Sequence, residues 1–501
     1  MSIEHLDVLI VGAGLSGIGA ACHLQKECPG KRWAILERRN AIGGTWDLFR
    51  YPGIRSDSDM FTLGYNFKPW TDPNAIADGP LIRDYVQETA REYGVDRHIR
   101  FGLQVKQAAW STETATWTVE ALREATGEVV RFSCNFLLMC SGYYNYDAGY
   151  SPDFPGIEKF KGRVVHPQKW TDDIDYANKK VVIIGSGATA ITLVPAMAKT
   201  AAKVTMLQRS PTYVISVPQR DVVSEKLRQF LPDKAVYRLA RTRNVGLQMF
   251  FYNLSRQKPE VVKRLIAKLT RRQLGADYDL RHFTPHYNPW DERMCVVPDS
   301  DLFRAIRKGK AEVVTDHIDT FTETGIRLKS GQELEADLIV TATGLRLQML
   351  GGMQVVVDGK PFDMAQSMNY KGAMFRDLPN LAMIFGYTNA SWTLKADLIS
   401  EYVCRLLKQM DKKGLRQCTP RDEEGLAQET PFLGLASGYI QRAANVLPKQ
   451  GDKAPWRLYQ NYALDLAMLR YGGLEDGHMV LSNPKPSIRA KIKAAAEAVR
   501  G

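Results

Sequence analysis

The chain has 501 residues, of which 45% are hydrophobic and 24% are charged, and its formal net charge is +12. A single hydrophobic core stops growing at about 250 to 300 residues, so two or more domains are expected. No apolar run reaches the roughly 18 to 20 residues that cross a bilayer, which argues against a transmembrane helix. The positive charge leaves three anionic partners open: nucleic acid, a membrane surface or a cofactor.

The N-terminus predicts a buried strand rather than an export signal. "MSIEHLDVLIVGAG" has Glu4, His5 and Asp7 where a secretory signal carries Lys or Arg. The seven cysteines form no Cys-x-x-Cys pair, as in a reduced cytosolic protein, and a flavin disulfide reductase would need such a pair. We therefore expect a cytoplasmic protein.

The first 37 residues predict a nucleotide-binding unit of strand, glycine turn, helix and second strand. Gly12, Gly14 and Gly17 have the G-x-G-x-x-G spacing, and Glu37 ends the strand "RWAILE", twenty residues after Gly17. Such a turn lets the backbone approach a pyrophosphate, and the helix N-terminus attracts its charge. Glu37 is expected to accept hydrogen bonds from ribose hydroxyls.

The next segment, "AIGGTWDLFRYPGIRSDSDMFTLGY", places arginines, aspartates and a Pro-Gly turn directly behind this unit. An alternative interpretation of Asp57 in this segment is a turn or cap residue.

A second unit begins at "KVVIIGSGATA", where Gly185, Gly187 and Ala190 have the G-x-G-x-x-A spacing. Its next strand, "KVTMLQRS", ends with Gln208 and Arg209 in place of a carboxylate. A guanidinium pairs with a 2′-phosphate that a carboxylate would repel, so NADP(H) is preferred over NAD(H). Two units indicate a resident nucleotide, FAD, and a visiting one, NADPH.

These features predict an α/β fold with two Rossmann-like dinucleotide-binding domains, for FAD and NADP, and a helical insertion. The FAD-binding domain is expected at 1–150 and 346–501, the latter including a C-terminal segment, and the NADP-binding domain at 151–217 and 291–345. The basic stretch 218–290 is the predicted insertion. Three interpretations of it stay open: a solvated helical face, helices that line a substrate entrance, or helices that touch a membrane surface.

One motif carries a family resemblance. Phe160, Gly162, His166 and Trp170 match the F-x-G-x-x-x-H-x-x-x-W pattern of type I Baeyer–Villiger monooxygenases, directly before the second glycine turn. The sister flavin-containing monooxygenases usually carry another aromatic residue at the last position. Thr171 departs from the Pro or Asp that often follows the Trp.

The resemblance extends over nearly the whole chain. "GGTWDLFRYPGIRSDSDM", "CSGYYNYDAGYSP", "HYNPWDERMCVVP" and "GYTNASWTLKADL" are similar to the ethionamide-activating subgroup of FAD-containing monooxygenases. The resemblance implies that NADPH reduces FAD and that O2 adds to the reduced ring at C4a. The resulting peroxyflavin inserts oxygen into ketones, giving esters or lactones, and also oxidises sulfides or thioamides.

The resemblance assigns the catalytic residues as Arg293, which stabilises the peroxide as an anion, and Asp57, which orients Arg293. Glu292 stands where many relatives have Lys. His166 is expected on a linker between domains, where it transmits cofactor binding or is simply a buried histidine. Motifs, fold analogy and resemblance together predict the cofactor-binding residues: Gly12, Gly14, Ser16, Gly17, Glu37, Gly44, Thr45, Trp46, Asp47, Arg55, Ser56, Asp57, Val105, Gly185, Ser186, Gly187, Ala188, Thr189, Ala190, Gln208, Arg209 and Ser210.

Further expectations concern the C-terminal half. Asn389 and Trp392 are expected near the pocket, at the start of a helix aimed at the flavin, and "NVLPKQGDKAPWRLYQNY" is expected to be mobile. No metal-ligating residue and no nucleic-acid partner is predicted, and the oligomeric state is not readable.

Two alternatives to the ketone monooxygenase remain. One is a flavin-containing N- or S-monooxygenase that never rearranges carbon. The other is a basic membrane- or nucleic-acid-surface protein with a vestigial nucleotide fold.

Overall fold

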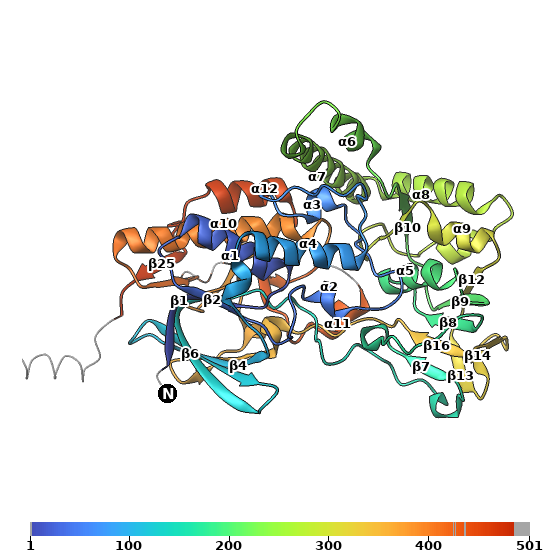
Figure 1. The fold of residues 1–501 in the computed structure, drawn as a ribbon, viewed down its shortest axis with the longest axis horizontal. Coiled ribbons are helices and arrows are strands. Elements are labelled where there is room, and N and C mark those ends of the chain that lie inside the picture. The colour runs from blue at the N-terminus through green and yellow to red at the C-terminus, as the bar shows by residue number, and fades with distance from the viewer. Residues whose placement is uncertain (1–2, 424, 426, 435–436, 485–501) are drawn as a thin grey trace, which may run out of the picture.

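The structure is a computed structural model that describes residues 3–423, 425, 427–434 and 437–484. It confirms the predicted fold class: two sheets, each built around a strand–glycine turn–helix unit, lie side by side, and a helical insertion covers part of both (Figure 1).

The first sheet has nine strands in the order β18-β17-β4-β5-β6-β1-β2-β3, with β21 also paired to β6. Its parallel part, β6-β1-β2-β3, follows from apolar strands such as "VLIV" and "WAIL", which are buried on both faces. The bounds are β1 Glu4–Val11, β2 Trp33–Leu36, β3 Ile99–Arg100, β4 Leu103–Ser111, β5 Thr116–Arg123, β6 Glu128–Met139, β17 Gln354–Val357, β18 Lys360–Pro361 and β21 Leu381–Met383.

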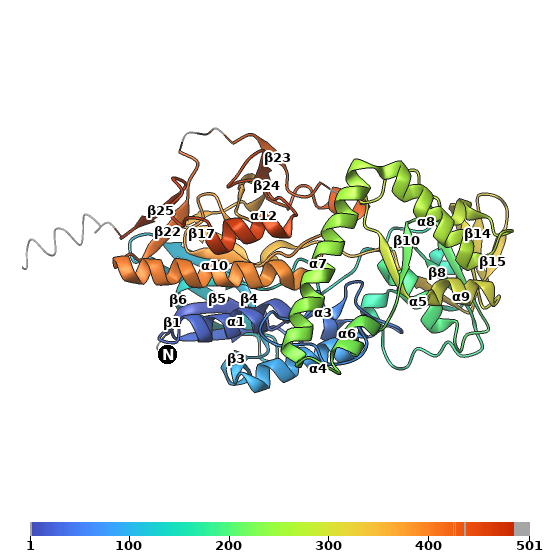
Figure 2. The same cartoon turned by 90° about the horizontal axis from the view of Figure 1, so that it is seen from above.

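Helices cover this sheet, and α10 packs directly against α1 (Figure 2). The bounds are α1 Leu15–Glu27, α2 Thr45–Leu48, α3 Met60–Leu63, α4 Gly79–Glu92, η1 Val95–His98, η5 Met349–Gly352, η6 Met364–Gln366, α10 Trp392–Lys413, α11 Gly438–Arg442, α12 Tyr462–Leu466 and η7 Ala467–Tyr471. Short strand pairs complete the domain: β19 Asn369–Tyr370 with β20 Met374–Phe375, β22 Gln417–Pro420 with β25 Met479–Ser482, and β23 Glu429–Pro431 with β24 Lys449–Gly451.

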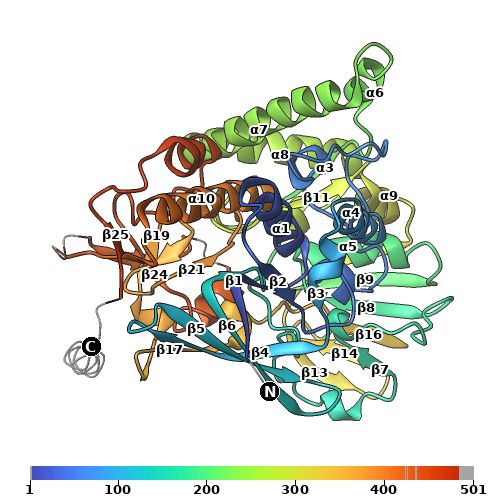
Figure 3. The same cartoon turned by 60° about the vertical axis from the view of Figure 1, so that its left-hand side comes forward.

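The second sheet is entirely parallel, in the order β12-β9-β8-β16-β7, and Figure 3 shows β9, β8, β16 and β7 stacked in this order. The bounds are η2 Ile157–Lys159, β7 Arg163–Val165, η3 Pro167–Lys169, β8 Lys180–Ile184, α5 Ala188–Met197, β9 Lys203–Gln208, α9 Asp301–Arg307, β12 Ala311–Thr315 and β16 Leu338–Thr341. A small antiparallel sheet flanks it: β13 Ile318–Thr322, β14 Gly325–Leu328 and β15 Glu333–Glu335.

The chain passes from the first sheet to the second after β6 and returns after β16. We call these connections the crossing segments, residues 140–150 and 342–348. They lie against each other, since Tyr144 and Leu347 form an antiparallel bridge. Each connection follows the carboxyl end of a parallel strand, which is where ligands bind in open α/β sheets.

The insertion lies between two paired strands, β10 Val214–Val217 and β11 Cys295–Pro298. It comprises α6 Val222–Leu227, α7 Asp233–Gln257, α8 Pro259–Leu274 and η4 Leu280–Phe283. Helix α7 is fastened to the first domain by Arg241, whose guanidinium donates to Asp397 at 3.2 Å and to the carbonyl of Gly64 at 2.7 Å. Among the described residues, no helix has the length and hydropathy of a membrane span.

The segment expected to be mobile is packed instead. Trp456 is only 1% exposed, and its carbonyl accepts a hydrogen bond from Asn369 at 3.2 Å. Gln460 accepts from the backbone N–H of Thr388 at 3.0 Å. Apolar and amide side chains within a polar sequence therefore anchor this segment, a pattern that composition conceals. Residues 485–501, part of the predicted C-terminal segment, lie outside the described residues.

Candidate active site

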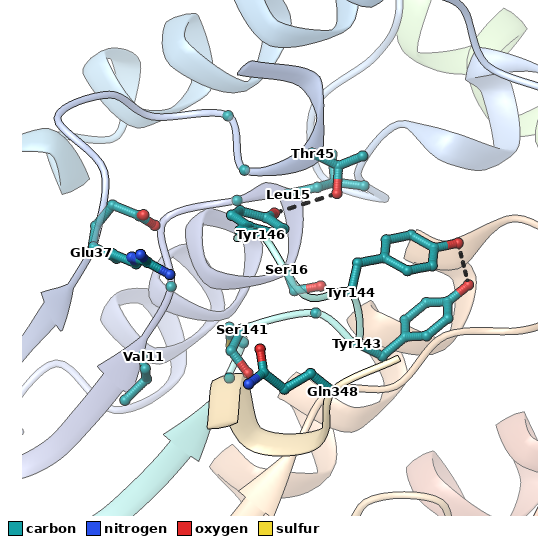
Figure 4. A pocket seen from close by; sticks show the side chains of 18 of the residues that line it. Val11, Leu15, Ser16, Glu37, Thr45, Ser141, Tyr143, Tyr144, Tyr146 and Gln348 are labelled. Atoms are coloured by element: carbon teal, nitrogen blue, oxygen red, sulfur yellow. Dashed lines mark hydrogen bonds between the residues drawn. The ribbon is translucent and has the colours of Figure 1, made fainter. Parts of the chain in front are cut away.

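A cavity of about 300 Å³ opens at the carboxyl ends of β1, β2 and β6 (Figure 4). Its lining includes the first glycine turn, residues 36–38, the Gly-Gly-Thr-Trp segment, residues 103–105, the crossing segment after β6, and residues 348–351. Glu37 lies at one end of the view in Figure 4, and Tyr143 and Tyr144 lie at the other. The cavity brings together these predicted residues: Gly12, Gly14, Ser16, Glu37, Gly44, Thr45, Trp46, Val105 and Arg293.

The first glycine turn is too tightly packed for any other residue at two positions. Gly12 has φ +106°, and a β-carbon added there would lie 2.6 Å from the carbonyl oxygen of Cys140. A β-carbon at Gly17 would lie 1.8 Å from the carbonyl oxygen of Gly12. Helix α1 begins after Gly14, and no side chain caps it. The N–H groups of its first turn therefore have no capping side chain as a partner. This geometry fits a diphosphate at the helix N-terminus.

Glu37 is held rigidly at the end of β2. One carboxylate oxygen accepts from the N–H of Ala13 at 2.6 Å, and the other accepts from the N–H of Arg39 at 2.8 Å. Burial raises the pKa of the Glu37 carboxyl, and these two amides oppose the rise. A carboxylate oxygen has room for a second hydrogen bond, so Glu37 fits ribose hydroxyls.

A buried hydroxyl without a partner provides a further test of whether the cavity suits a dinucleotide. The Oγ of Ser141 lines the cavity and is buried, yet it has no hydrogen-bond partner among the described residues. Buried polar groups are nearly always paired, so this hydroxyl points to a ligand with polar groups along the cavity. The residues present therefore fit a dinucleotide such as FAD.

Arg293 marks the end of the cavity that carries the aromatic residues. Its Nε donates to the carbonyl of Thr388 at 3.3 Å, and its terminal nitrogen lies 4.0 Å from a carboxylate oxygen of Asp57. Burial opposes the charge of Arg293, but Asp57 and the phenol of Tyr143 raise the pKa of its guanidinium. The side chain is still 36% exposed because it borders the cavity. The site thus contains a fixed cation.

Aromatic side chains surround this cation. Tyr143 stacks on Trp392 with ring centroids 5.3 Å apart, and the two tyrosine hydroxyls of Tyr143 and Tyr144 are 2.8 Å apart. The indole N–H of Trp392 donates to the Oγ of Ser16 at 2.8 Å, which fixes the start of α10 against the first glycine turn. Asn389 lies nearby, donating to the carbonyl of Gln460 at 2.9 Å.

The second glycine turn is exposed. Gly185 has φ +133°, and an added β-carbon would lie 2.3 Å from the carbonyl oxygen of Ala342, whereas one at Gly187 would meet nothing within 4 Å. Gly187, Arg209 and Ser210 are exposed. Ser186 donates to the carbonyl of Ser210 at 3.0 Å, joining the turn to the end of β9. Ala188 and Thr189 open α5, and Ala190, the third residue of this helix, is buried.

Gln208, expected to bind the cofactor, is bonded within the protein instead. It is 1% exposed, and its amide nitrogen donates to the carbonyl of His282 and to the Oγ of Thr315, both at 2.8 Å. Gln208 therefore supports the sheet, and Arg209 is the side chain available to a phosphate.

Three other predicted residues have partners away from the cavity wall. Arg55 pairs with Asp301 of α9 at 2.5 Å and so joins the first domain to the second. Asp47 accepts from Arg39 at 2.5 Å and from Arg50 at 2.7 Å, which explains the arginines around the Gly-Gly-Thr-Trp segment. Ser56 closes a turn by accepting from the N–H of Ser58 at 2.9 Å.

The fingerprint residues join the crossing segments to the second domain. The Nε2 of His166 lies 3.1 Å from the carbonyl oxygen of Gly344, and its Nδ1 accepts from the N–H of Gln168 at 3.2 Å. These partners define a neutral ring with the proton on Nε2, and burial lowers the pKa of His166 accordingly. The ring also fills the space beside Gly149, where an added β-carbon would lie 2.0 Å from it.

The other fingerprint positions are structural. Phe160 is buried against Phe321, and a β-carbon at Gly162 would lie 2.6 Å from the Phe160 ring. Trp170 packs against the hydrophobic core beneath the second sheet, edge-on to Tyr176.

Sequence reasoning missed several residues of the cavity wall. Those after β6 had an available signal, because "CSGYYNY" directly follows the carboxyl end of a buried strand, where ligand sites form. The missed residues include Leu63, Gln104, Ser141, Tyr143, Tyr144, Tyr146, Gln348, Leu350 and Gly351.

Comparisons with known proteins place this geometry in context. The family model for flavin-binding monooxygenase-like proteins matches residues 6–350. "FAD-containing monooxygenase EthA" of Mycobacterium tuberculosis (strain ATCC 25618 / H37Rv) is 54% identical over 486 residues, which cover 96% of this chain and 99% of that protein. "Putative FAD-containing monooxygenase MymA" of the same strain is 54% identical over 479 residues, covering 95% and 97%.

Among solved structures, "oxidized steroid monooxygenase bound to NADP" is similar with a TM-score of 0.76 at 22% identity, covering 96% of this chain and all of that one. At this identity the similarity establishes the fold.

Proposed function

The chain belongs to the flavin-binding monooxygenase-like family, and we propose that it is a type I Baeyer–Villiger monooxygenase that uses FAD, NADPH and O2 to convert ketones into esters or lactones. The same site would oxidise sulfides and thioamides. The observation that carries the proposal is the guanidinium of Arg293, fixed at the wall of a cavity whose other end has the geometry of a nucleotide site.

The predicted cofactors fit separate sites. FAD would be held by the first glycine turn and Glu37, and it supplies hydride acceptance and reaction with O2, which no side chain provides. NADPH would be held by the second glycine turn and by Arg209, whose guanidinium suits a 2′-phosphate.

Arg293 provides the charge that oxygen transfer requires. Its planar group is held on one side by the carbonyl of Thr388 and on the other by Asp57, so it does not have to reorganise when negative charge develops on oxygen. Preorganised charge of this kind contributes most where water is excluded. Asp57 fixes the orientation of Arg293 and is therefore its positioning partner.

Aromatic side chains form the wall at this end of the cavity. Tyr143 and Trp392 stack on each other, and Trp392 is fastened to Ser16. Their apolar faces suit a small organic ketone or sulfide. Because NADPH is a cytoplasmic reductant and all seven cysteines are free thiols, we place the reaction in the cytoplasm.

Replacement of Arg293 tests this function. In Arg293→Ala we expect NADPH oxidation to continue while ester formation from a ketone falls about a hundred-fold, with hydrogen peroxide released instead. The measurement is NADPH consumption, ester and peroxide in one incubation. Arg293→Lys keeps the charge but loses the planar fork, so its ester yield should lie between wild type and Arg293→Ala.

Product analysis separates the alternatives. An ester from an alkyl or phenyl methyl ketone requires carbon rearrangement, so a flavin monooxygenase restricted to nitrogen and sulfur would give sulfoxide from a sulfide and no ester from the ketone. An unchanged ester yield in Arg293→Ala would remove Arg293 from the mechanism.

A further inference from the structure

The positive charge of the chain is concentrated in the helical insertion. Between residues 222 and 272 there are thirteen Lys or Arg residues and three Asp or Glu residues, so this segment provides ten of the twelve net positive charges. Some of them serve the fold, as Arg241 does. Others, including Arg264, Lys268 and Arg272, are exposed and have no carboxylate partner among the described residues.

Large apolar side chains are exposed on the same helices. Val261, Leu265 and Leu269 of α8 are spaced four residues apart and are 46%, 43% and 44% exposed, which makes a continuous apolar stripe. On α7, Leu247 is 58% and Phe250 66% exposed. Further exposed apolar residues of the segment are Val222, Val223, Phe230, Leu231 and Leu239. Isolated exposed apolar residues are ordinary, but an accumulation of ten on one segment marks an interaction surface.

These helices lie uncovered on one side of the molecule. Figure 2, seen from above, shows α7 facing the viewer between the two sheets, with α8 beside the second sheet. The opposite faces of α7 and α8 are used for packing, by Val236, Tyr237 and Ala240 of α7 and by Val262 and Ile266 of α8. The exposed residues are therefore not needed to hold the helices in place.

We propose that this surface, formed by the exposed residues of α6, α7 and α8, docks on an anionic lipid membrane. Exposed Leu, Val and Phe side chains can enter the boundary of the acyl chains, while the neighbouring Lys and Arg side chains bind anionic headgroups. Nucleic acid would use the charge but would leave the aliphatic stripes exposed to water. A second copy of this surface would be repelled by the same net charge.

The position of α7 connects docking to the proposed monooxygenase. Leu247 and Phe250 are exposed, whereas Gln248 and Tyr252 of the same helix line a small cavity together with Asn389. Asn389 follows Thr388, whose carbonyl accepts from Arg293. A helix in contact with lipid would thus also border the surroundings of the active site. This step rests on the proposed function and predicts lipophilic ketones or sulfides, taken from the membrane, as the substrate class.

Vesicle sedimentation tests the docking without reference to activity. We expect the full-length protein to sediment with vesicles of phosphatidylglycerol and phosphatidylcholine, and to bind pure phosphatidylcholine vesicles at least ten-fold more weakly. Raised salt should weaken the binding to the anionic vesicles. Leu247→Ser with Phe250→Ser, and separately Arg264→Gln with Lys268→Gln, should each reduce that binding about ten-fold or more.

A control variant removes one apolar and one cationic side chain from the first sheet, outside the insertion. Val129 of β6 is 55% exposed and Lys360 of β18 is exposed, so Val129→Ser with Lys360→Gln should bind vesicles like wild type. All variants should retain the NADPH oxidation rate of wild type with a water-soluble substrate, which shows that they are folded.

The proposal is overturned if neither variant pair on the insertion differs from the control pair. It is also overturned if the protein retains duplex DNA but not anionic vesicles, or if it forms a dimer that α7 variants dissolve and binds no vesicles. Sedimentation without any ketone or sulfide oxidation would support the docking and refute the proposed function.

Discussion

The two glycine turns repeat one arrangement of strand, turn and helix, yet the surroundings of their second glycines differ. In the first turn a β-carbon added at Gly14 would lie 3.4 Å from the Cα of Gly44. In the second turn Gly187 is exposed, and a β-carbon there would meet nothing within 4 Å. The same local structure can therefore enclose a ligand or leave it free to exchange.

The difference arises from what the rest of the chain adds. Residues 43–46, the crossing segment 140–150 and residues 348–351 close over the first turn. The second turn gains only the hydrogen bond between Ser186 and Ser210 and the exposed Arg209. We infer a resident nucleotide in the first site and a visiting one in the second, and the following changes test this contrast.

The largest effect is expected from Gly17→Ala. The added methyl group would lie 1.8 Å from the carbonyl oxygen of Gly12, so the turn must shift and FAD retention should be lost together with most of the folded protein. Flavin absorbance per chain after gel filtration and the soluble yield measure this outcome. Gly187→Ala, at the position of the second turn equivalent to Gly14, is the control and should keep its flavin and stability, since the added methyl group would meet nothing within 4 Å. Equal flavin loss in both variants would contradict the contrast.

A smaller and more selective effect is expected from Arg209→Ala. Loss of a charge-assisted hydrogen bond to the 2′-phosphate should raise KM for NADPH about ten-fold or more and leave KM for NADH nearly unchanged. Steady-state kinetics with both nucleotides check this, and the flavin content should stay at the wild-type level. If both KM values rise together, Arg209 does not distinguish the two nucleotides.

His166 fastens the region between the two sites, and its effect should depend on pH. Because burial lowers its pKa below the ordinary 6.5, the neutral ring is favoured in the folded state. Stability is therefore present above pH 6.5 and lost as pH falls through the lowered pKa. Comparing urea unfolding of wild type and His166→Gln at mildly alkaline and acidic pH, we expect wild type to lose more stability on acidification than the variant does. Parallel pH profiles would show that His166 does not carry this linkage.

The smallest effect concerns Glu292. Burial raises the pKa of its carboxyl, and the positive charge of Arg209 opposes that rise. Glu292→Gln should lower KM for NADPH a few-fold, because a negative charge that competes with the phosphate is removed. In wild type, NADPH affinity should improve as pH falls towards the raised pKa. A higher KM in Glu292→Gln would assign the carboxylate a supporting role instead.

Local pattern predicted the strands, the glycine turns and the fold class, because the spacing of glycines and apolar residues fixes those elements directly. It did not predict the contact between Tyr143 and Trp392, although Trp392 was expected near the pocket. Tyr143 and Trp392 are distant in sequence and meet only because β6 ends and α10 begins at one edge of the sheet. Nor could the pattern show that Gln208 points into the sheet or that Arg55 pairs with Asp301, since partners of charged and amide side chains are set by tertiary contacts.

The central claim is that the first site retains its nucleotide and the second exchanges its own. Its most direct test is to incubate the protein with FAD and NADPH, pass it through gel filtration, and quantify both nucleotides in the protein fraction. The account predicts one FAD per chain and little nicotinamide nucleotide. Colourless protein, or nicotinamide nucleotide retained as firmly as FAD, would contradict it.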